Sequence, residues 1–145
     1  MADLEQFSVR IRDIGKQLPQ RVSTLRRKTA LVVDRELVMS TAVDTGRARS
    51  NWVVQVGQPS REELPPYVPG ESGSSSTANA QGAISQARAE LSLDPGDKDI
   101  YISNNLPYIQ RLNTGWSAQS PAGFVQRAVQ LGLQWLRRQR IISGN

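Results

Sequence analysis

The sequence contains neither cysteine nor histidine among its 145 residues. Their absence excludes disulfide bonds, thiolate catalysis and metal binding by imidazole, and it removes the side chain most used for acid–base chemistry near neutral pH. No run of about 18 apolar residues is present, and the N-terminus lacks the charged-then-apolar pattern of a signal peptide. We therefore expect a soluble protein, made in a reducing cytoplasm, that is not an enzyme, uses no cofactor and enters no membrane.

Apolar residues are also scarce, at 38 % of the chain with a mean hydropathy of −0.44. A chain of this length fits one domain with a modest core. We expect a single domain over residues 1–145 with extended attachments.

Charge is distributed unevenly around a net value of +5. Residues 100–145 carry five arginines and no acid, whereas residues 50–99 carry three bases against seven acids. Such polarity suits binding to nucleic acid, and it equally suits docking copies of one protein head to tail.

The first 42 residues repeat apolar side chains every three or four positions, which is the spacing of one helical face. This pattern predicts a helix over 3–18, a break or kink at Pro19, and a second helix of about 24 residues ending near Ala42. The second helix begins with a basic group, which suits a solvated face or a surface turned toward DNA or a protein: Arg21, Arg26, Arg27 and Lys28.

The middle of the chain alternates short regular segments with long irregular ones. Polar residues 43–50 predict a turn, residues 51–56 a strand, residues 79–93 a helix and residues 99–103 a second strand. Residues 58–80, here called the arm, are rich in proline, glycine and serine; we expect them to be mobile in a free subunit and to lie on a neighbour in an assembly. Asp94, Asp97 and Asp99 are spaced like calcium ligands, but no glutamate closes a twelve-residue loop, which argues against an ion site.

The last third contains the best-marked helix start. Ile109 and Leu112 predict one or two helical turns after Pro107, with a left-handed exit at residues 113–115. Ser120 can cap a final helix over 121–139 whose terminal arginines complement its dipole. The whole pattern predicts an α+β fold: long N-terminal helices (1–42) and a C-terminal helix packed on a small antiparallel or mixed β-sheet, with a long irregular loop.

Three short motifs, in this order, carry a resemblance to a known family. They are Val43–Arg47 (VDTGR) before Asn51-Trp52, then Asn105–Tyr108 (NLPY) with Leu112–Gly115 (LNTG), and last Ser120–Phe124 (SPAGF). Together they resemble the tail-component family of long-tailed bacteriophages that includes minor tail protein Z, whose members are also called neck or tail-completion proteins.

The resemblance implies a structural virion protein at the head–tail junction. It implies a homo-oligomeric ring, expected to be a hexamer, that joins tail terminator or tail tube proteins to the head connector and lets DNA pass without sequence recognition. We expect interface residues at Arg47, Arg49, Tyr67, Val68, Tyr108, Arg111 and Trp116. We expect DNA-facing residues at Arg26, Arg27, Lys28, Arg137, Arg138 and Arg140.

Two other functions stay open. One is a neighbouring virion component such as a tail terminator or head–tail stopper, which the position in an imaged particle would distinguish. The other is a small DNA-binding protein without sequence preference, which predicts a steep salt dependence of DNA affinity for the isolated chain.

Overall fold

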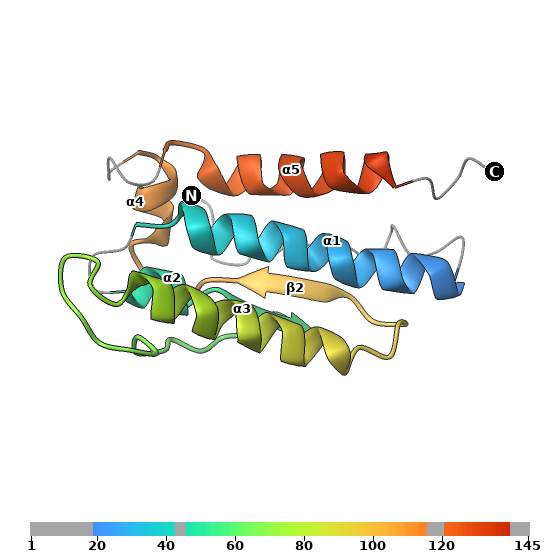
Figure 1. The fold of residues 1–145 in the computed structure, drawn as a ribbon, viewed down its shortest axis with the longest axis horizontal. Coiled ribbons are helices and arrows are strands. Elements are labelled where there is room, and N and C mark those ends of the chain that lie inside the picture. Colours follow the sequence, from blue (N-terminus) through green and yellow to red (C-terminus); the bar gives the residue numbers. More distant parts are fainter. Residues whose placement is uncertain (1–18, 43–45, 116–120, 140–145) are drawn as a thin grey trace.

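The computed structural model describes residues 19–42, 46–115 and 121–139. Within them the chain forms an α+β fold of helices and one small antiparallel sheet, which confirms the predicted class (Figure 1). The elements are α1 (Pro19–Ser40), α2 (Arg47–Ser50), β1 (Val53–Val56), α3 (Ser76–Ser92), β2 (Ile100–Ser103), α4 (Ile109–Asn113) and α5 (Phe124–Arg138).

The sheet pairs β1 with β2 in antiparallel register, with Val53 opposite Ser103 and Val56 opposite Ile100. The first strand begins two residues later than the sequence predicts, because the backbone N–H groups of Asn51 and Trp52 donate back to Arg47 and Arg49 at the end of α2. The Trp52 side chain enters the core. Its indole N–H donates to the Thr41 hydroxyl at 2.8 Å, and its ring meets Phe124 edge-on, with 6.5 Å between the ring centroids. The tryptophan thus joins the end of α1 to the start of α5.

Helix α1 is the centre of the helical layer, with α5 along one side and α3 along the other (Figure 1). The close approach of α3 and α5 to their neighbours depends on small residues. Ala80, Ala83 and Ala87 are buried along α3, and Gly132 of α5 lies where a Cβ would come within 2.2 Å of Val33 Cγ2. Small side chains let the backbones approach and leave little tolerance for added atoms.

Several boundaries differ from the prediction by a few residues. Helix α1 starts at Pro19, because proline lacks only an N–H that the first turn of a helix leaves unpaired anyway. Helix α3 starts at Ser76, so the last five residues of the arm are helical. Residues 47–50 form a short helix within the predicted turn. The predicted helix over 3–18 lies outside the described residues, and so do residues 43–45 of that turn.

Asn113 connects α4 to α5. Gly115 has a φ of +97°, which confirms the left-handed exit, and the Asn113 side-chain oxygen accepts the Val125 N–H at 3.0 Å. The Asn113 carbonyl also accepts the Gly123 N–H at 2.7 Å. This cap comes from the preceding helix, and α5 starts at Phe124, three residues after the predicted Pro121. The expected cap, Ser120, lies outside the described residues.

Candidate interaction surface

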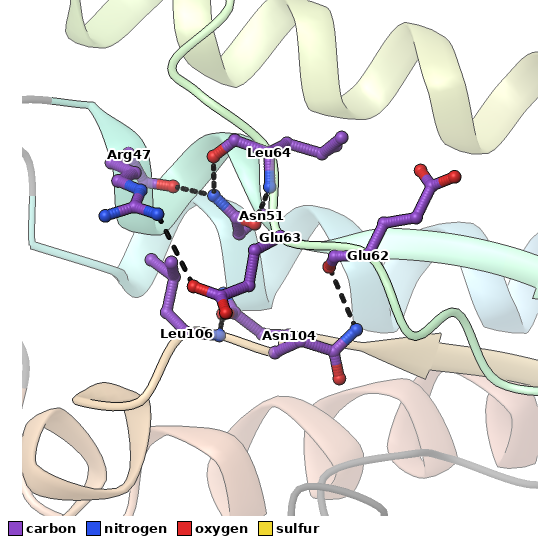
Figure 2. Close-up of polar contacts among 8 residues, drawn as sticks. Arg47, Asn51, Glu62, Glu63, Leu64, Asn104 and Leu106 are labelled. Carbon is purple, nitrogen blue, oxygen red and sulfur yellow. Dashed lines mark hydrogen bonds and ion pairs between the residues drawn. The ribbon is translucent and has the colours of Figure 1, made fainter.

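Three side-chain amides each bind the backbone of one distant residue through a pair of hydrogen bonds. The Asn51 amide group donates to the Leu64 carbonyl and its oxygen accepts the Leu64 N–H, both at 2.7 Å (Figure 2). Asn79 binds Val68 in the same way at 2.9 and 2.8 Å. Gln86 binds Val54, at 2.8 and 3.0 Å, along the side of β1 away from β2. Each amide satisfies a backbone donor and acceptor as a neighbouring strand would.

Two of these amides hold the arm against its own chain. They bind Leu64 and Val68, on either side of Pro65-Pro66. The Ser50 hydroxyl accepts the Tyr67 N–H at 3.1 Å, and the Asn105 amide donates to the carbonyls of residues 60 and 62 at 2.7 and 3.0 Å. Between residues 60 and 68 the arm is therefore held by hydrogen bonds to other segments of the same chain.

The fixed arm displays two apolar side chains that the sequence marked as interface residues. Tyr67 is 41 % exposed and Val68 is 44 % exposed. The inner side of the Tyr67 ring lies on Gly82, where a Cβ would come within 2.7 Å of Cγ. Burial raises the pKa of Tyr67 above its ordinary value, and Asp34 adds to this shift when its carboxyl is ionised. Rigid, partly exposed aromatic groups are typical anchors of protein interfaces.

The remaining predicted interface residues have different surroundings. Arg47 is exposed and forms a loose pair with Glu63, with 3.4 Å between the charged atoms (Figure 2). Arg111 is exposed, while Tyr108 packs partly against the core. Trp116 lies outside the described residues.

Arg49 is buried, so its assignment to an intermolecular surface is wrong. Its guanidinium donates to the carbonyls of Met39 and Thr41, both at 3.1 Å, and to that of Ser76 at 3.4 Å. Arginine can satisfy carbonyls at the end of a helix, and here it does so for α1. Burial lowers the pKa of Arg49 from its ordinary value.

Arg26 is also buried, so its predicted role in facing DNA is wrong. Its guanidinium binds Asp94 with 2.5 and 3.2 Å between the paired atoms, and it donates to the Lys98 carbonyl. Asp94 is buried, pairs with Arg26 and accepts the Gly96 N–H at 3.0 Å, so its carboxylate serves these contacts and does not point to a calcium site. Across the described ranges no cluster of three or more acidic side chains could hold a metal ion.

The other predicted DNA-facing residues gather at one end of the molecule. Because α1 and α5 run in opposite directions, the start of α1 lies beside the end of α5 (Figure 1). Lys28, Arg137 and Arg138 are exposed there, and Arg27 is half-buried with a hydrogen bond to the Ser23 carbonyl. Arg140 lies outside the described residues.

Asp34 is completely buried in α1 and was not among the residues singled out from the sequence. Neither carboxyl oxygen has a hydrogen-bond partner among the described residues, and desolvation raises its pKa well above the ordinary value of 3.8. A signal was present, because Asp34 lies between Ala30 and Val38 on the apolar side of the helix. The arm-binding amides had no such signal, since asparagine and glutamine are ordinary surface residues.

Comparison of the chain with models of protein families, curated proteins and solved structures gave no significant match. Among the helices that the structure describes, none is both long and apolar enough to cross a bilayer.

Proposed function

We propose that this chain is a structural subunit of the virion of a long-tailed bacteriophage, a tail-completion or neck protein. Its copies form a ring at the head–tail junction, which joins the tail to the head connector and lets DNA pass. The neighbouring roles of tail terminator and head–tail stopper are variants of this proposal.

The fixed arm is the observation that carries the proposal. Paired amide hydrogen bonds hold its backbone while Tyr67 and Val68 extend into solvent. A surface that is rigid before binding loses less conformational entropy on association. This arrangement suits a subunit that docks against copies and neighbours. The three ordered sequence motifs support the same assignment.

Two measurements test the proposal. Light scattering on the purified chain should detect a closed oligomer, and imaging of phage particles should locate it at the neck. Replacing Tyr67 and Val68 by serine should weaken the oligomer, whereas Leu93→Ser should not, although Leu93 is 78 % exposed. A monomeric chain that is also absent from virions would contradict the assignment.

Sequence-independent DNA binding is a second candidate function, favoured by the basic end of the α1–α5 pair. Lys28, Arg137 and Arg138 are exposed there. If this were the main function, the isolated chain would bind duplex DNA with an affinity that falls steeply with salt. The structural assignment predicts weak binding by single subunits.

A further inference from the structure

A groove of about 340 Å³ is lined by Arg35 of α1 together with Gln81, Ile84, Ser85 and Arg88 of α3. Helices α1 and α3 pack side by side, so one arginine comes from each wall. All the polar lining residues are exposed, and Ile84 is partly buried. The groove is thus open, basic and supported by regular structure.

Neither arginine of the groove has a partner in the part of the chain that the structure describes. No ion pair or side-chain hydrogen bond joins Arg35 or Arg88 to another described residue. Guanidinium groups bind carboxylates and phosphates through paired hydrogen bonds. The Gln81 amide and the Ser85 hydroxyl can donate to the same anion. The groove therefore fits an anionic group.

The arm of the same protein offers a matching pair of carboxylates at Glu62 and Glu63. Hydrogen bonds on both sides hold their backbone in place. The Glu62 carbonyl accepts the Asn105 amide N–H, and Asn51 binds Leu64, the residue after Glu63. The Glu62 carboxylate has no partner among the described residues. Glu63 has a surface pair with Arg47, of a kind that contributes little. The Glu62 carboxylate is therefore available to another molecule, and Glu63 would exchange its surface pair with Arg47 for the new contact (Figure 2).

The groove and the arm lie on opposite flanks of α3. Gln86 and Glu90 bind the backbone of β1, and Gly82 carries the Tyr67 ring, so this flank faces the sheet and the arm. With about 3.6 residues per turn, residues 81, 84, 85 and 88 project to the other flank. One chain therefore cannot place its own acidic pair in its own groove while the arm stays fixed.

We propose that the groove between Arg35 and Arg88 receives Glu62 and Glu63 of a second copy of this chain. The contact is heterologous, because each copy gives its arm to one neighbour and its groove to the other, and such contacts close into a ring when the rotation allows. This inference rests on the proposed function, for which it specifies the contact between subunits.

Charge exchange between two variants tests the contact. One variant carries Arg35→Glu and Arg88→Glu, and the other carries Glu62→Arg and Glu63→Arg. Each alone opposes like charges, which should weaken association roughly a hundredfold. In an equimolar mixture every groove meets an arm of opposite charge, so rings of alternating variants should form again. Light scattering and sedimentation of the separate and mixed full-length chains measure this.

Matched controls change the same number of charges elsewhere. Arg127→Glu with Lys98→Glu, and Glu71→Arg with Asp97→Arg, alter exposed residues outside the groove and the acidic pair, and should leave association unchanged. Circular dichroism and melting temperatures check folding. If a reversed variant does not fold, neutral Gln replacements of the same residues should still weaken association, by a smaller factor.

Several results would overturn the inference. They are a wild-type chain that stays monomeric at high concentration, separate reversed variants that assemble normally, or a mixture that stays dissociated. Loss of DNA binding by the groove variant, with unchanged assembly, would instead assign the groove to phosphate. Reversed variants that assemble normally into a ring still located at the neck would refute this contact and leave the proposed function standing.

Discussion

Replacing Asp34 by asparagine should change how the stability of this protein depends on pH. The carboxyl is completely buried, both of its oxygens lack partners among the described residues, and its pKa lies well above 3.8 because of desolvation. At a pH above the pKa of Asp34 in the unfolded chain, folding must therefore take up a proton at this site, and this uptake carries a free-energy penalty. Below about pH 4 the carboxyl is protonated in both states and the penalty is absent.

The sign follows from proton linkage. The folded state binds more protons than the unfolded state between the two pKa values, so the free energy of unfolding falls as pH rises. For one carboxyl the fall is at most about 1.4 kcal/mol per pH unit, and it continues up to the folded pKa. Asparagine keeps the shape and does not titrate. The difference in the free energy of unfolding between Asp34→Asn and the wild type should be near zero at about pH 4. Above that pH it should grow in favour of the variant by up to about 1.4 kcal/mol per pH unit.

Urea unfolding, followed by tryptophan fluorescence and circular dichroism at a series of pH values, measures this difference. Asp97→Asn removes one exposed carboxylate and serves as the control for the loss of a charge. A stability difference between the wild type and Asp34→Asn that stays constant from about pH 5 to 8 would refute the reasoning. So would a wild type that is more stable than this variant at neutral pH.

Three further substitutions probe the packing. Arg26→Met should lower the free energy of unfolding by about 3–5 kcal/mol, because it leaves Asp94 buried without its cation; chemical denaturation measures this, and a loss near zero would contradict it. Gly132→Ala should cost about 1–3 kcal/mol and lower the melting temperature, because the new Cβ meets Val33 at 2.2 Å. Asn51→Ala should release the arm, so that trypsin cleaves it faster in the folded protein, while stability falls by only about 1–3 kcal/mol.

Secondary structure was largely decided by the sequence. The apolar spacing from Val22 to Met39, the β-rich run at residues 100–103 and the pair Ile109 and Leu112 each encode an element through neighbours a few positions apart. The structure places these elements close to where the sequence predicts them. Such signals survive without tertiary context, because each turn of helix or stretch of strand repeats its own pattern.

Only the tertiary structure decided which charged and polar side chains face solvent. Arg26 shares a helical face with the buried residues Ala30 and Val33, but its partner Asp94 is 68 positions away, so no neighbour in the sequence shows that its charge is paired. The arm has the composition of a mobile loop, yet side-chain amides of other segments bind its backbone. Partners brought together by folding set the burial of a charge and the order of a loop, because both depend on desolvation and hydrogen bonding across distant segments.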